Sequence, residues 1–258
     1  MKMIQINNIE KTTKSRKSGK INVNEDNISK LTKSKESFLD FSKDIKFSGP
    51  SLYFYLQIIK KINENQYEKL FEDNSFIEYL YATLACWGMH RMDKNTRMAE
   101  FEAFKESITK NKDNFTELSK EKIIDADIEK IKDKLLKIFA TLRIMSREKA
   151  PKFVAHSKIM HFLLPNLIPP MDKGHIIYFF YGKKRKTKKG KTDKYLPKIK
   201  DEETTFIKTL ELFQKIANQL NLKETDLKNQ WDTSIPKLID NAIIGYNNFN
   251  DKKFGVKT

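Results

Sequence analysis

A carboxylate and two lysines that could take part in chemistry lie around a proline-rich turn in the second half of the chain. Asp172 directly follows Pro169-Pro170-Met171, Lys152 lies 20 residues before Asp172, and Lys158 lies between them. A carboxylate held at a cavity can act as a general base or stabilise a developing positive charge. A desolvated lysine can attack an electrophilic carbon, because burial lowers the pKa of its amine. The simpler interpretation is that Asp172 only caps a helix.

The residues around Asp172 resemble part of a known enzyme superfamily. An apolar helix, a proline-containing connector, an Asp and an aliphatic helix are similar to the downstream half of the helix-hairpin-helix DNA glycosylase signature. In that family a P-V-D Asp caps a helix, and a Lys near the start of the preceding helix is the nucleophile of bifunctional members. Pro170-Met171-Asp172 corresponds to the tripeptide, and Lys152 or Lys158 to the lysine. The likeness covers about 30 residues, and the family's glycine-rich hairpin turn is missing, since residues 89–173 contain no glycine.

The resemblance implies a helical DNA-repair enzyme, a glycosylase or lyase, with those three residues as its catalytic groups, or a related defence factor. Such an enzyme takes its target base out of the stack, and Trp87, Tyr178 or Phe179 could receive it. The other interpretation of these aromatic residues is core packing. Segments 87–92 and 164–172 are also similar to blocks of prokaryotic proteins that have no assigned activity.

Metal and cofactor motifs are poorly represented. Cys86 and His90 are four residues apart, and His156 and His161 are five apart. Helical spacing of this kind can bring two ligands to one metal, but protein zinc sites use three or four protein ligands. The sequence also lacks a Walker loop, a dinucleotide fingerprint and a nucleophile elbow. We therefore expect neither a metal nor a cofactor.

Positive charge is concentrated in two segments. Residues 183–200 hold ten bases and one acid, and residues 1–35 hold nine bases and three acids, so the two segments carry +15 of the net charge of +16. The rest of the chain is therefore nearly neutral. A neutral body with two cationic segments favours a polyanionic partner.

We expect this partner to be nucleic acid, DNA rather than RNA, contacted through its phosphates. Lysines act as point charges on phosphates and carry little information about base identity, so the contact should not be sequence-specific. The alternative function is a helical protein-interaction module without catalysis, whose lysines maintain solubility. Lysine makes up 44 of the 50 cationic residues, as an A/T-rich genome would also produce. The expected phosphate contacts are Lys183, Lys184, Arg185, Lys186, Lys188, Lys189, Lys191 and Lys194.

Cysteine content and hydropathy indicate an intracellular, cytoplasmic protein. Cys86 is the single cysteine, which excludes an internal disulfide. No apolar run approaches the roughly 18 residues of a membrane span, and the N-terminus lacks the apolar stretch of a signal peptide. The sequence does not indicate an oligomeric state.

The elements that must position these residues are predicted to be helical. Residues 52–150 contain no proline and one glycine, Gly88, and their apolar residues recur at helical spacing. We expect a mostly α fold, a compact domain of about eight or nine helices preceded by a disordered basic arm over residues 1–35. The domain would span 36–258, with possible lobes at 36–150 and 151–258 and a flexible basic loop at 183–200.

Proline, glycine and capping residues predict where individual helices begin and end. Pro50 should open one helix, and Ser119 should cap a long one that continues to Leu142. Pro151 should open a helix that stops at Pro165. Asp172 should cap a buried helix over residues 173–181 that ends at Gly182, and further helices should cover residues 202–220 and 235–246.

Overall fold

The computed structural model describes residues 22–43, 45, 48–89, 97–186 and 192–253 and confirms a mostly α fold. The helices of the first half are α1 (Glu25–Leu31), α2 (Lys35–Lys43), α3 (Gly49–Glu64), η1 (Tyr67–Glu72), α4 (Asn74–Cys86), α5 (Phe101–Thr109), α6 (Lys112–Leu118) and α7 (Ile128–Thr141). The second half contains α8 (Phe153–Leu163), η3 (Lys173–Ile177), α9 (Tyr178–Tyr181), β1 (Lys183–Lys186), β2 (Thr192–Tyr195), α10 (Glu202–Gln219), η4 (Glu224–Asp226) and α11 (Ile235–Lys253).

Several predicted helix boundaries are confirmed. Gly49-Pro50 opens α3, and α8 ends at Leu163, just before Pro165. Gly88 has the positive φ of 92° that favours glycine after a helix end. The prediction that Ser119 caps a long helix was wrong. Ser119 instead follows the last residue of α6, and Asp127 caps α7, because its side chain accepts a hydrogen bond from the Lys130 amide.

Parts of two segments that were expected to be irregular form regular elements. The predicted arm covered residues 1–35, but residues 25–31 form α1, whose N-cap Asn24 accepts a hydrogen bond from the Asn27 amide. Residues 1–21 lie outside the described residues. The predicted basic loop 183–200 contains a two-stranded antiparallel hairpin, in which Lys183 pairs with Tyr195 and Lys184 with Lys194. We call this element, β1 and β2, the basic hairpin.

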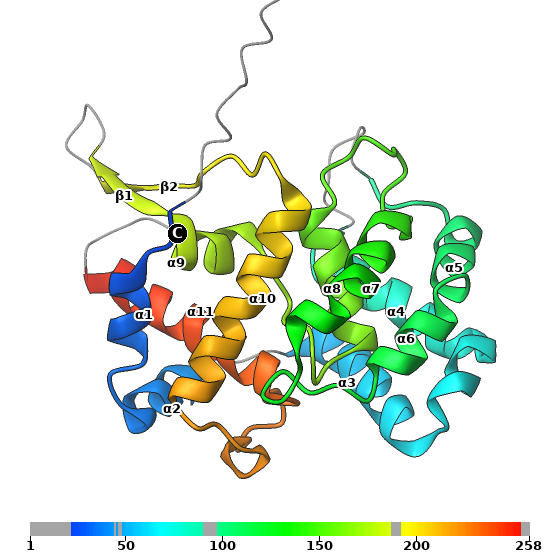
Figure 1. The fold of residues 1–258 in the computed structure, drawn as a ribbon, viewed down its shortest axis with the longest axis horizontal. Coiled ribbons are helices and arrows are strands. Elements are labelled where there is room, and N and C mark those ends of the chain that lie inside the picture. Colours follow the sequence, from blue (N-terminus) through cyan, green and yellow to red (C-terminus); the bar gives the residue numbers. More distant parts are fainter. Residues whose placement is uncertain (1–21, 44, 46–47, 90–96, 187–191, 254–258) are drawn as a thin grey trace, which may run out of the picture.

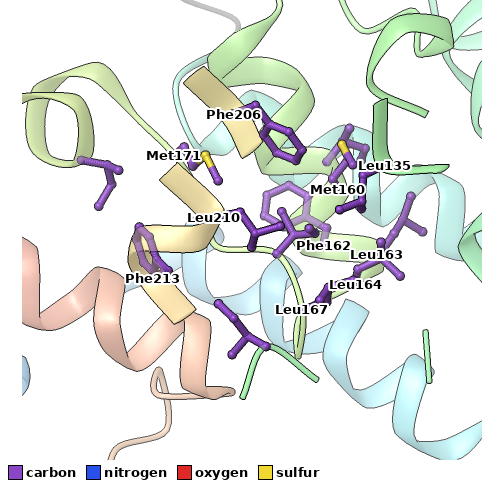
Figure 2. Close-up of a cluster of buried hydrophobic side chains, with 14 of the residues drawn as sticks. Leu135, Met160, Phe162, Leu163, Leu164, Leu167, Met171, Phe206, Leu210 and Phe213 are labelled. Atoms are coloured by element: carbon purple, nitrogen blue, oxygen red, sulfur yellow. The ribbon is translucent and has the colours of Figure 1, made fainter. Parts of the chain in front are cut away.

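Helix α8 is buried on all sides, as every residue from Ala155 to Leu163 is buried. Its apolar side chains contact α4, α3 and α10. One continuous hydrophobic cluster extends from Ile28 to Tyr246 and so includes residues of both halves of the chain. Figure 2 shows part of this cluster, where Met160, Phe162 and Leu163 of α8 lie near Phe206, Leu210 and Phe213 of α10.

The proline-rich connector that follows α8 folds back onto it. Its residues Leu167, Ile168 and Met171 are buried. The Ser157 hydroxyl donates to the Met171 carbonyl at 3.1 Å and accepts from the Met171 amide at 3.3 Å. Nδ1 of His161 donates to the Ile168 carbonyl at 2.7 Å. These bonds satisfy buried backbone groups that no regular element pairs.

His156 and His161 are structural histidines. Nδ1 of His156 lies 2.7 Å from the Phe139 carbonyl and therefore donates to it. Because Nδ1 of His161 carries the hydrogen that it donates to the Ile168 carbonyl, its Nε2 accepts a hydrogen bond from the Tyr55 hydroxyl at 2.8 Å. Burial lowers the pKa of His156 to about 4 and that of His161 to about 3, so both rings are neutral at pH 7.

The chain closes on itself where the N-terminal helices α1 and α2 pack beside the last helix, α11 (Figure 1). Gly245 permits this contact, because a Cβ at this position would collide with the backbone carbonyl of Phe41. None of the helices in the described part of the chain is long and apolar enough to cross a membrane.

We predict that Gly245→Ala destabilises the protein by roughly 1–3 kcal/mol, because α11 and α2 must separate to make room for the methyl group. The free energy of unfolding, measured in urea, checks this. Gly174→Ala is the matched control, since the added Cβ would make only an ordinary contact, at 3.5 Å from the Asp172 carboxylate. Equal stability of the two variants would contradict the prediction.

Candidate functional site

A cavity of about 680 Å³ lies where α8, η3 and α11 meet the end of α4. Five side chains that can carry charge line it: Lys158, Asp172, His175, Lys237 and Asp240. Trp87 and the backbone around Gly88 form another part of its wall. Its volume lies in the range of small-ligand sites, which measure roughly 300–1,000 Å³.

Lys158 and Asp172 are brought together by the connector that folds back onto α8. Their chain neighbours Ser157 and Met171 are hydrogen-bonded to each other, so the two functional side chains begin from adjacent points of the backbone. Both line the cavity. Two of the three residues singled out in the sequence therefore line the same cavity, although they are 14 positions apart in the chain.

Lys158 is a buried amine with an unusual environment. Its residue is only 8% exposed, and Nζ donates a hydrogen bond to the Trp87 carbonyl at 2.8 Å. Burial lowers the pKa of Lys158, and the charges of Asp172 and Asp240 partly oppose this effect. An amine whose pKa is lowered is unprotonated for a larger fraction of the time, and only the unprotonated form is a nucleophile.

Asp172 is both a helix cap and part of the cavity wall. Its Oδ1 accepts the His175 amide at 2.7 Å at the start of η3, as predicted for an N-cap. The two interpretations of this residue are therefore compatible. Capping fixes the direction of the carboxylate, and the same carboxylate lines the cavity beside Lys158.

Lys152 lies elsewhere. Its Nζ donates to the Ala140 carbonyl at 3.1 Å, and it lines a separate cavity together with His156. The structure thus distinguishes the two candidate lysines by their positions, which the sequence could not do. Lys158 shares a cavity with Asp172, and Lys152 does not.

A buried ion pair in the cavity wall had no clear sequence signal. Nζ of Lys237 lies 2.6 Å from Asp240, and the side chains are 1% and 4% exposed. Lys237 also donates to the Asn241 side chain at 2.8 Å. A Lys and an Asp three residues apart on a helix usually form a surface pair. Only the packing of α11 shows that this pair is buried.

The aromatic candidates occupy different environments. Phe179 is fully buried and Tyr178 is nearly so, in agreement with core packing. Trp87 lines the cavity, but its ring is held edge-on against Phe162 at a centroid distance of 4.9 Å, and its Nε1 donates to the Ser51 carbonyl at 3.2 Å. Trp87 is therefore a fixed wall of the cavity.

The basic hairpin, which lies beside α9 in Figure 1, carries exposed cations. Lys183, Lys184 and Arg185 are exposed. Lys194, which was expected to contact phosphates, is instead ion-paired at 2.6 Å with the buried Asp251 of α11 and lies over the Tyr178 ring. It therefore anchors the hairpin. Lys188, Lys189, Lys191 and the side chain of Lys186 lie outside the described residues.

An exposed aromatic residue of the hairpin was not anticipated. Tyr195 is 48% exposed and pairs directly with Lys183 across the two strands. Side chains alternate between the faces of a strand, so Lys183, Arg185 and Tyr195 share one face, and Lys194 points to the other. The sequence did not indicate which residues share a face, because lysines occur at both alternating positions of this segment.

Among the described residues no group of three or more His, Cys, Asp or Glu side chains could hold a metal ion. His90 lies outside this part of the chain.

Comparison of the chain with protein-family models, curated proteins and solved structures finds no match in any of the three.

We predict that Asp251→Asn loosens the basic hairpin, because Lys194 then loses its charged partner. Removing one partner of a buried ion pair destabilises the structure around it by roughly 3–5 kcal/mol, so amide exchange in the two strands should accelerate about tenfold or more. Hydrogen–deuterium exchange with mass spectrometry checks this. The control is Asp193→Asn, which changes the same charge at an exposed position of the hairpin. Equal acceleration in both variants would show that the buried ion pair is not the anchor.

Proposed function

We propose that the protein binds nucleic acid, DNA in preference to RNA, and carries out DNA glycosylase or lyase chemistry in the cavity. The observation that supports this most is the shared cavity of the buried Lys158 amine and the capped Asp172 carboxylate. Base excision requires a nucleophile and a group that stabilises positive charge on the sugar, and these two residues supply that combination. The preference for DNA depends on the family resemblance of the same segment.

In the proposed reaction the unprotonated Nζ of Lys158 attacks C1′ of the nucleotide. The glycosidic bond breaks, and the base leaves with the bonding electron pair and takes up a proton from water. The Lys158 nitrogen then gives up both of its protons to solvent while the C1′–O4′ bond breaks. The electron pair of that bond stays on O4′, which takes up a proton from water, and an imine between Lys158 and C1′ of the opened sugar remains. The Asp172 carboxylate stabilises the positive charge that develops on the sugar before the new bond is complete.

A cavity beneath the surface requires the nucleotide to leave the stack. Extrusion costs a few kcal/mol and is cheapest for a mismatched, damaged or single-stranded base, which favours such substrates. The indole of Trp87 offers a rigid aromatic wall for the extruded group. Ser51 and Asn248 add polar groups to the lining that could contact the base or the sugar.

The position of the basic hairpin supports the same proposal. Asp251, which holds Lys194, and Asn248, which lines the cavity, are three residues apart on α11. Less than one helical turn, a rise of about 4.5 Å along α11, therefore separates the anchor of the hairpin from the wall of the cavity. Phosphates bound by Lys183, Lys184 and Arg185 would hold the strand beside the cavity.

We predict that replacing Lys183, Lys184 and Arg185 by Ser weakens DNA binding and makes it less sensitive to salt. Each lost phosphate contact reduces the slope of log affinity against log salt by about 0.9 for a duplex, so the slope should fall by up to roughly 3. Fluorescence anisotropy between 50 and 300 mM salt, with a labelled duplex, measures both effects.

The matched control removes three exposed lysines from other surfaces, Lys60, Lys137 and Lys208. It changes the net charge by the same amount. A similar loss of DNA affinity in both variants would therefore mean that binding depends on the net charge of the protein and not on the basic hairpin. The absence of DNA binding at low salt, or binding that is unchanged at 0.5 M salt, would contradict the proposed partner. The helical protein-interaction module would then be the better description.

We predict that borohydride traps a covalent adduct between Lys158 and a damaged or modified DNA duplex. Lys158→Ala should abolish the adduct, and Asp172→Asn should slow its formation about a hundredfold or more. Asparagine caps helices as well as aspartate does, so this second variant removes the charge and keeps the cap. Gel electrophoresis and peptide mass spectrometry identify the adduct and its site.

Lys152→Ala is the control for the trapping experiment, because Lys152 lies outside the cavity and its removal should leave the adduct intact. An adduct on Lys152 would contradict the assignment of Lys158. If a broad panel of substrates gave neither an adduct nor a free base, the catalytic part of the proposal would fail while DNA binding could still stand.

A further inference from the structure

The buried Lys237–Asp240 pair is difficult to explain by stability alone. Moving two charges out of water costs several kcal/mol for each ion, and replacing a buried pair by apolar residues is often neutral or stabilising. Both side chains are less than 5% exposed, yet both line the cavity that contains Lys158 and Asp172. Charged groups with perturbed surroundings in a cavity are candidates for a functional role.

Lys237 and Lys158 share a neighbour. Nζ of Lys237 lies 5.3 Å from the centroid of the Trp87 ring, and Nζ of Lys158 lies 5.9 Å from it. Cations are attracted to the faces of an indole ring over such distances. The two ammonium groups are thus close enough for the charge of one to affect the other in a site with little water.

The position of Lys237 is fixed by a buried polar network. Lys237 donates to Asn241, and the Asn241 amide donates to Asp232 at 2.7 Å. Asp232 also accepts from the Asn229 side chain at 2.8 Å. Because its hydrogen-bond partners are themselves hydrogen-bonded, the Lys237 ammonium group has a defined position. A charge must have a defined position to affect the protonation of a neighbouring group in a consistent way.

The charged and titratable groups around Lys158 come from three elements. Asp172 and His175 belong to η3, Lys237 and Asp240 to α11, and the Cys86 thiol to α4; all five line the cavity. Burial lowers the pKa of Lys158 most strongly. The charges of Asp172 and Asp240 raise this pKa, and the charge of Lys237 lowers it. The two members of the pair therefore act on Lys158 in opposite directions.

We infer that the Lys237–Asp240 pair is a positioning pair that sets the charge of Lys158 and holds it in the cavity. The inference deepens the proposed function, since it has a purpose only if Lys158 is the nucleophile. While the pair is intact, each of its charges offsets part of the effect of the other on Lys158. Loss of either member leaves one uncompensated charge beside the amine.

The experiment follows reductive methylation of Lys158 by formaldehyde and cyanoborohydride as a function of pH, with peptide mass spectrometry as the readout. Only the unprotonated amine reacts, so the midpoint of the profile reports its protonation. Asp240→Asn leaves the Lys237 charge and should lower the midpoint by about one pH unit. Lys237→Met leaves the Asp240 charge and should raise it by a similar amount. The exposed Lys208 in the same samples should not shift.

A purely structural role would disturb the site in both variants without producing shifts of opposite sign. The inference is overturned if Asp240→Asn does not lower the midpoint, or if Lys237→Met does not raise it. Circular dichroism establishes that each variant is folded. If Lys237→Met does not fold, Asp240→Glu replaces it in the comparison. This variant keeps the charge and should restore the midpoint of the original protein, and a midpoint as low as that of Asp240→Asn would overturn the inference.

Methylation requires no nucleic acid, so this result can be separated from the proposed function. Shifts of opposite sign in a protein that neither binds DNA nor forms an adduct would contradict the proposed function and leave the charge coupling in place. DNA binding and trapping at Lys158 without the shifts would support the proposed function and contradict the charge coupling.

Discussion

The fold of the functional region depends on hydrogen bonds between α8 and the connector that follows it. The connector is buried, and buried backbone groups need partners. Ser157 bonds both backbone groups of Met171, and His161 binds the Ile168 carbonyl. Pro169 and Pro170 have no amide hydrogen and so require fewer partners. These bonds fix the end of the connector against α8 and thereby place Asp172 beside Lys158.

Helix α11 connects the interior of the site with its surface. Near its start, Lys237 and Asp240 form part of the cavity wall, and near its end Asp251 holds the basic hairpin through Lys194. The close packing of α11 on α2 at Gly245 fixes the position of the same helix. One rigid element therefore determines both the charge around Lys158 and the location of the exposed cations. In the proposed function, this arrangement would let a strand bound at the hairpin place one nucleotide in the cavity.

The carboxylates of the cavity oppose the effect of burial on the Lys158 amine. Burial alone would favour the neutral amine, and the two carboxylates of Asp172 and Asp240 moderate that effect. The direction of the Asp172 carboxylate is determined by its cap on η3. The observed cap and the proposed chemical role of Asp172 are compatible, since a charge stabilises a developing cation best when its orientation is fixed.

The sequence alone determined the helical class, the boundaries near Pro50 and Pro165, and the role of Asp172 as a cap, because these follow from local spacing and backbone chemistry. It did not distinguish Lys158 from Lys152, since both precede Asp172 on the same segment. Nor did it show that Lys194 is paired, because its partner Asp251 is distant in sequence. Burial and pairing depend on which surfaces meet in space, so only the tertiary structure could decide which cations belong to the cavity, which anchor the hairpin and which face solvent.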